Sequence, residues 1–177
     1  MRLWTRLISI LCCIALAACA RAPGALVVRS AAIESGVLSA RVDWQPDARV
    51  LAALDHGIAL DFIVSVAAGT PGVLGMDNAA QQRRRLQLRY FPLSRQYQLR
   101  DLDLAQTRSF SARSLALAAF EELRLPLPGW DAHGARRFAL DIALDRESLP
   151  GALRLPALLQ PAWHLSSGEY AWQTPAG

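Results

Sequence analysis

The clearest chemical signature lies near the N-terminus, where an apolar run ends on a cysteine. Leu16, Ala17 and Ala18 stand directly before Cys19, an order that resembles the bacterial lipobox of one aliphatic and two small residues before an invariant cysteine. Lipoprotein maturation attaches a diacylglycerol to the cysteine sulfur, cleaves the chain before the cysteine and acylates the new amino group. The sequence therefore predicts Cys19 as a lipid attachment site, with acyl chains that hold the protein on a membrane.

The residues before this cysteine have the layout of a secretory signal. Two arginines precede an apolar stretch over residues 7–18, which is shorter than the roughly 20 residues of a membrane-spanning helix. We expect residues 1–18 to form a lipoprotein-type signal peptide and residues 19–25 to link the anchor to the domain. Two alternatives stay open: ordinary secretory cleavage after Ala20, which gives a soluble periplasmic protein, and a buried first helix.

The residue after the cysteine also bears on localisation. Ala20 stands where Asp would favour retention at the inner membrane, so a lipidated product is expected at the outer membrane, facing the periplasm.

The three cysteines and the charge balance exclude several classes of function. All cysteines lie at positions 12, 13 and 19, so the segment after the anchor folds without disulfides and holds no cysteine nucleophile or thiolate metal site. The 19 basic residues are all arginines, and the formal net charge is only +4. With such a small charge on an exported chain, nucleic acid is not an expected partner.

Apolar and polar residues alternate in several later segments, which predicts strands with one buried and one wet face. The alternating segments are residues 37–44, 58–66, 84–101 (two strands around a Pro-Leu-Ser turn) and 137–145. We expect one domain over residues 26–174, of the mainly β type of α+β protein: an antiparallel β-sandwich-like domain with one or two inserted short helices. The glycine-containing residues 67–82 are expected to form a long loop.

Two short helices are predicted between the strands. The first covers residues 46–57 and ends at its final glycine. The second lies within residues 110–123, with Ser111 as its N-cap and with Phe110 packed on Leu115 as a hydrophobic staple.

Arg85, Arg89 and Arg100 are the candidate binding residues of the domain. If the strands of residues 84–101 pair as a hairpin, these arginines and the intervening glutamines form a basic and polar strip on its outer face. Such a strip would receive an anionic surface: a lipid phosphate, a glycan or an acidic patch on a partner. The alternative is a solvated sheet face whose charges prevent edge-to-edge aggregation.

Four stretches carry a resemblance to a known family. They are "VDWQPDARVLAALDHGIALDFIVSV", "RRRLQLRYFPLSRQYQLRD", "SFSARSLALAAFEEL" and "LRLPALLQPAWHLSSGEYAW". From Leu26 to Trp172 the chain resembles the domain-of-unknown-function family 4390, exported proteobacterial proteins without an assigned activity. The resemblance implies a periplasm-facing domain and, since members are often encoded beside a membrane-bound sensor histidine kinase, such a kinase as a partner. It implies neither catalytic residues nor lipidation.

No local motif indicates catalysis, a cofactor or a metal. The three histidines are isolated, and the chain has neither HExxH nor GxSxG. A hydrolase-type triad would have to assemble from distant residues such as Ser94 or Ser166 with a histidine. Asp101 and Asp103 could face one cation, but they lack the glycine and terminal acid of a calcium loop.

The sequence thus predicts an exported, lipid-anchored envelope domain that binds a partner and has no enzymatic activity, cofactor or metal. A membrane sensor kinase or another envelope protein is the expected partner. The first alternative is a carrier of an apolar or anionic small molecule, and the second is a hydrolase-type enzyme with a non-local site. A large apolar cavity would favour the carrier, and convergent His, Asp and Ser side chains would favour the enzyme. A filled core with an exposed patch would favour the binding domain.

Overall fold

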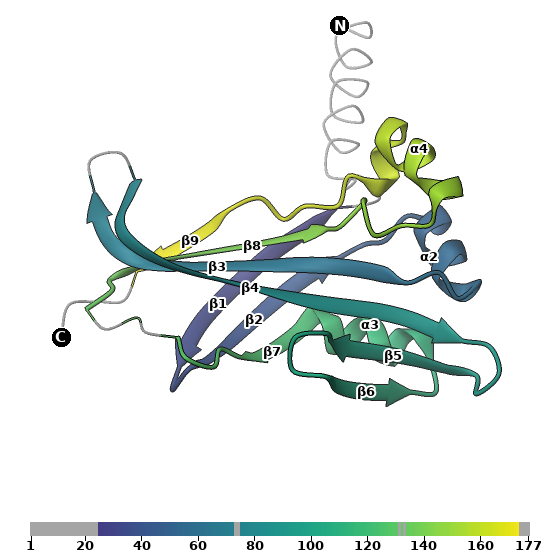
Figure 1. Ribbon diagram of the computed structural model, residues 1–177, viewed down its shortest axis with the longest axis horizontal. Coiled ribbons are helices and arrows are strands. Elements are labelled where there is room, and N and C mark those ends of the chain that lie inside the picture. The colour runs from purple at the N-terminus through teal and green to yellow at the C-terminus, as the bar shows by residue number, and fades with distance from the viewer. Residues whose placement is uncertain (1–24, 73–74, 131, 133, 174–177) are drawn as a thin grey trace, which may run out of the picture.

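Two antiparallel sheets form the computed structural model, which describes residues 25–72, 75–130, 132 and 134–173 (Figure 1). One sheet has three strands in the order β1-β2-β7, and the other has six in the order β6-β5-β4-β3-β8-β9. The apolar faces of both sheets meet in one core. The prediction of a mainly β, sandwich-like α+β fold is confirmed.

The small sheet begins with a hairpin of β1 (Leu26–Glu34) and β2 (Val37–Trp44). Ser35 and Gly36 form the turn, both with positive φ angles (51° and 73°), the backbone that a two-residue hairpin turn needs. The far edge of β2 pairs with β7 (Glu122–Pro126), a strand from much later in the chain.

The large sheet is built around the long pair β3 and β4. Its strands are β3 (Leu60–Gly72), β4 (Gly75–Phe91), β5 (Gln96–Asp101), β6 (Gln106–Phe110), β8 (Arg137–Leu144) and β9 (Tyr170–Gln173). Consecutive strands β3 to β6 pair as hairpins, and β8 returns to the free edge of β3. β3 and β8 are buried on the inner face because their alternate residues are apolar.

The expectation of a loop over residues 67–82 is wrong. Strands β3 and β4 stay paired as far as Gly72 and Gly75, and β8 pairs with β3 as far as Gly69. These residues are small or polar and do not alternate, so their sequence gave no strand signal. Pairing between β3 and β4, joined by β8 as far as Gly69, satisfies many of their backbone N–H and C=O groups and keeps them extended.

An aromatic cluster joins the two sheets and the second helix. The Trp44 ring centroid lies 5.3 Å from that of Phe62 and 5.2 Å from that of Phe120, and the two phenylalanines are 4.6 Å apart. All three side chains are buried. Tilted and edge-on arrangements of this kind suit the ring quadrupoles and add to the gain from burying apolar area.

Helix α2 (Ala48–Asp55) lies where the sequence predicts the first helix. The Asp47 side chain accepts a hydrogen bond from the Arg49 N–H and caps its start. Gly57, with φ of +82°, follows the last turn and takes the left-handed conformation that ends the helix.

Helix α3 (Arg113–Glu121) is present, but two predicted details of its start are wrong. The N-cap is Ala112, which makes no side-chain cap, and not Ser111. Leu115 is 53% exposed, so it cannot form the expected staple with Phe110. The buried residues Ala116, Ala119 and Phe120 set the phase of the helix, and tertiary packing overrides the local capping signal.

A third helix, α4 (Gly151–Leu159), and a 3-10 turn, η1 (Pro161–Trp163), follow β8. The described residues therefore contain three α-helices, where one or two were expected. No helix in this part of the chain is long and apolar enough to cross a bilayer.

Candidate functional site

The predicted lipid site lies outside the described residues. This holds for Cys19 and for the lipobox residues Leu16, Ala17 and Ala18. Lipidation stays a prediction from the sequence.

The arginines singled out by the sequence lie on the outer face of the β4–β5 hairpin. In the pairing of these strands, Arg89 stands opposite Gln98, and Gln87 stands opposite Arg100. Directly paired residues point to the same side of a sheet, so these four side chains share the outer face. Arg85 follows at the next outward position of β4, just past the end of the paired ladder. We call Arg85, Arg89 and Arg100 the arginine strip.

Within the strip, Arg85 is neutralised by a carboxylate of its own chain. Its Nε and Nη2 atoms each lie 3.3 Å from Asp103 Oδ1, and its backbone N–H donates to Asp103 Oδ2 at 2.7 Å. The Arg85 side chain is 60% exposed, so this is a surface ion pair.

Arg89 and Arg100 have no such acidic partner among the described residues. Arg89 donates from Nε to the carbonyl oxygen of Gly57 at 3.2 Å, and its guanidinium lies 4.9 Å from the Phe91 ring centroid. The Arg100 side chain forms no hydrogen bond or ion pair in the part of the chain that the structure describes, and both arginines are exposed. The carboxylate of Asp61, which stands opposite Gln87 in the pairing of β3 with β4, accepts a hydrogen bond from Gln87 at 2.9 Å. Two positive charges therefore remain available on this face.

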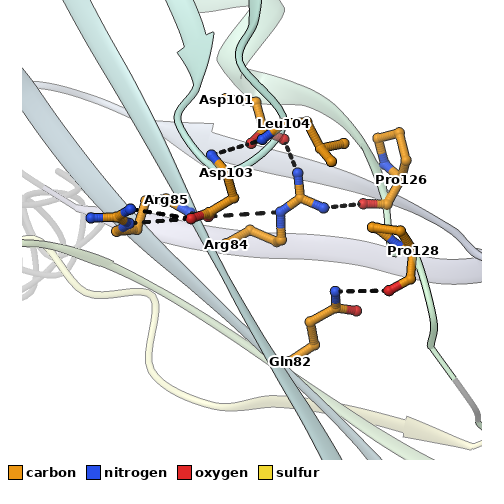
Figure 2. A network of polar contacts seen from close by, with 8 residues as sticks. All are labelled: Gln82, Arg84, Arg85, Asp101, Asp103, Leu104, Pro126 and Pro128. Atoms are coloured by element: carbon orange, nitrogen blue, oxygen red, sulfur yellow. Dashed lines mark hydrogen bonds and ion pairs between the residues drawn. The ribbon is translucent and has the colours of Figure 1, made fainter.

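The inner face of the same hairpin holds a buried ion pair, which Figure 2 shows from close by. Arg84 is 2% exposed and Asp101 is 7% exposed. Arg84 Nη2 donates to Asp101 Oδ2, and Arg84 Nη1 donates to the carbonyl oxygen of Pro126 at 2.6 Å. Since Pro126 ends β7, this one guanidinium connects the large sheet to the small sheet.

Asp101 is held as an ion by several donors. The backbone N–H groups of Asp103 and Leu104 each donate to Asp101 Oδ1 at 3.0 Å. Burial alone would raise the pKa of Asp101, but the hydrogen bonds from Arg84 and from these N–H groups outweigh it and lower the pKa below its ordinary value. The carboxylate is therefore charged at neutral pH.

The two carboxylates of the Asp-Leu-Asp segment face arginines of the same chain. Asp101 faces Arg84, and Asp103 pairs with Arg85 and lies 3.8 Å from Arg84 Nε. The described residues contain no cluster of three or more His, Cys, Asp or Glu side chains that would hold a metal ion.

Sequence reasoning missed the buried pair, although a signal was present. Leu86 and Leu88 set the inward phase of β4, and continuing that phase backwards by two residues points Arg84 inward. On β5, Leu99 sets the phase that points Asp101 inward. Two opposite charges at inward positions of paired strands indicate a buried ion pair.

Comparison with known proteins gives a family and no relative of known activity. A family model for a domain of unknown function, DUF4390, matches residues 26–173. The chain belongs to the DUF4390 family. This match confirms the resemblance seen in the sequence. No curated protein and no solved structure matches the chain.

The hollows described on this DUF4390 domain are open depressions over the outer faces of its sheets. One lies over the small residues Ser65, Ala67 and Ala139, between Arg83 and Asp141. Others lie over the small sheet, around Ser39 and Arg41. None of these hollows is lined mainly by the apolar side chains of the core.

The described histidines of the DUF4390 domain contact backbone groups and not serines. His56 Nδ1 lies 2.6 Å from the carbonyl oxygen of Ala52, and His164 Nε2 lies 3.2 Å from that of Leu158. Ser166 Oγ donates to Asp141 at 3.4 Å. Within the described residues no histidine completes a serine triad.

Proposed function

We propose that this DUF4390 protein is an exported accessory protein, anchored through Cys19 to the periplasmic side of the outer membrane, that binds an acidic surface of an envelope protein. The periplasm-facing portion of a membrane sensor kinase is the first partner to test. One observation carries the proposal: the β4–β5 register sets Arg89 and Arg100 on one exposed face with no acidic partner among the described residues.

The geometry of the strands supports this role. Arg89 and Arg100 are diagonal neighbours in the pairing of β4 with β5, an arrangement in which the Cα atoms are about 7–8 Å apart. The backbone of Arg100 pairs with β4 on one side and β6 on the other, and the backbone of Arg89 pairs with β5. Because the strands hold both residues in place, little order is lost when a partner binds. Gln98 and Gln87 stand opposite them and add neutral donors and acceptors. A guanidinium offers paired N–H groups that match a carboxylate.

The interior favours surface binding over carriage of a small molecule. The apolar faces of the two sheets pack directly on each other through residues such as Leu38, Phe62 and Phe120, each fully buried. A carrier needs an enclosed apolar space, and the described hollows are open depressions on the surface.

The test is crosslinking and capture from bacterial membranes with a charge-reversed strip. Arg89→Glu with Arg100→Glu should lower capture of a specific envelope protein by about 10- to 100-fold, because attraction to acidic groups becomes repulsion. The matched control is Arg41→Glu with Arg124→Glu, two exposed arginines on the small sheet, which should leave capture unchanged. Equal capture by all three proteins would contradict binding through the strip.

Anchoring is tested separately with Cys19→Ser. If Cys19 is lipidated, this variant leaves the membrane fraction, and mass spectrometry of the parent finds acyl chains on the mature N-terminus. A variant that fractionates as the parent does would contradict the anchor and leave the strip to be judged on its own.

A further inference from the structure

Helix α4 exposes a row of leucines. The described residues have five exposed large apolar side chains, and Leu155, Leu158 and Leu159 of α4 are 65%, 58% and 73% exposed. Their spacing of three and four residues sets them on one side of the helix, while Ala157 is buried against the domain. We call these three residues the leucine face. An apolar group of this kind on a small protein marks a contact surface.

The leucine face lies at the end of the domain where the chain enters the fold. Gln45 N–H donates to the carbonyl oxygen of Ala25 at 3.1 Å, which fixes the start of β1 beside the end of β2. Two residues further along the chain, Asp47 caps α2, and Arg49 of that helix donates to Gln160, directly after α4, at 3.1 Å. Figure 1 shows α2, α4 and the beginning of β1 at this same end.

The short link between the anchor and the domain limits how far this end can move from a membrane. Ala25 is the sixth residue after Cys19, and a fully extended chain spans at most about 3.3–3.6 Å per residue. A lipid on Cys19 therefore keeps Ala25, the residue before β1, within about 20–22 Å of the lipid headgroups. The leucine face shares that end of the domain.

The charges of α4 suit a lipid surface. The helix has no acidic residue, and its one charged residue is Arg154, which is exposed. Apolar side chains beside arginine are typical of helices that lie in the interface of a bilayer. An arginine in this position favours anionic headgroups.

From these observations we infer that the leucine face of α4 docks on the bilayer that holds the lipid anchor, so that the domain sits on the membrane in one orientation. The inference rests on the envelope anchoring proposed above. It goes beyond that proposal because it assigns a second membrane contact and fixes which end of the domain faces the lipid.

The test is photo-crosslinking of the full chain in bacterial membranes. p-Benzoylphenylalanine replaces Leu158, or Leu155 in a second protein, and the matched control carries it at Leu115, an exposed leucine on α3. Intact-mass analysis then reads both the adduct and the acyl chains on Cys19. We expect a phospholipid adduct at least tenfold more abundant from position 158 than from position 115.

Each result separates docking from anchoring. Acylated Cys19 without a lipid adduct at 155 or 158 overturns docking and keeps the anchor. A protein adduct in place of lipid, or equal lipid adducts at 158 and 115, also overturns docking. A lipid adduct specific to 158 on a chain with unmodified Cys19 supports docking and contradicts the anchor. Unmodified Cys19 with no adduct contradicts both.

Discussion

The two faces of the β4–β5 hairpin use the same residue type in opposite ways. On the inner face, Arg84 is buried and bound to Asp101 and to the carbonyl oxygen of Pro126. On the outer face, Arg89 and Arg100 are exposed and have no carboxylate partner in the described structure. The inner arginine holds the two sheets in one arrangement, while the outer ones are available to a partner. The alternation of a strand assigns these roles, since neighbouring residues point to opposite sides.

The largest expected effect comes from breaking the inner pair. Arg84→Met should lower the free energy of unfolding by about 3–5 kcal/mol, because it leaves the Asp101 carboxylate buried without its counter-charge. Chemical denaturation at neutral pH measures this loss.

A second variant identifies the cause of that loss. Arg84→Met combined with Asp101→Asn should recover part of the stability, because no charge is stranded and the amide oxygen still accepts from the N–H groups of Asp103 and Leu104. If the double variant is no more stable than the single one, packing of Arg84 explains the loss instead of the unpaired charge.

A smaller effect is expected from acid. The pKa of Asp101 is lower in the folded chain than in the unfolded one, so the stabilisation it gives is complete above the ordinary carboxyl pKa. It is lost as the pH falls below about 4 and through the folded pKa. Thermal unfolding between pH 6 and pH 3 should show a steeper loss for the parent chain than for Asp101→Asn. Parallel curves would contradict the assignment of this carboxylate as a source of stability.

The smallest effect is expected on the outer face. Arg85→Gln should change the free energy of unfolding by less than about 1 kcal/mol. The Arg85 side chain is 60% exposed, and an ion pair at the surface adds little stability. The same denaturation experiment compares it with Arg84→Met, one residue earlier in the chain. A loss as large as that of Arg84→Met would remove the contrast between the two faces.

The sequence predicts those elements whose burial follows a regular period. Residues 37–44 form β2, and residues 60–66 of the predicted segment 58–66 lie in β3. The two strands flanking the Pro-Leu-Ser turn also form as expected. The first helix is predicted because its apolar face and final glycine agree, and the structure adds Asp47 as its cap. The pairing that lines up the arginine strip follows from the same alternation.

Some helices and strands were not predicted because their own sequence shows no regular pattern of buried residues. β6 has four exposed residues and is held by pairing with β5 alone. α4 contains Pro156 and turns its leucines outward, so neither its composition nor its apolar spacing predicts a packed helix. β7 follows α3 without a break, and only its pairing with β2 makes it a strand. Arg84 was missed because a run of three arginines is typical of a solvated surface.

Because β7 lies far from β2 along the chain, it also affects the order in which the two sheets form during folding. β3 to β6 pair with neighbours a few residues away along the chain, whereas the pairing of β2 with β7 closes a loop of roughly 80–90 residues. Contacts of such long range form slowly. While the chain folds, the edge of β2 therefore stays uncovered until the large sheet and α3 have brought β7 into place. Arg41, at the last pair of the β2–β7 ladder, supplies a charge that discourages another chain from pairing there first.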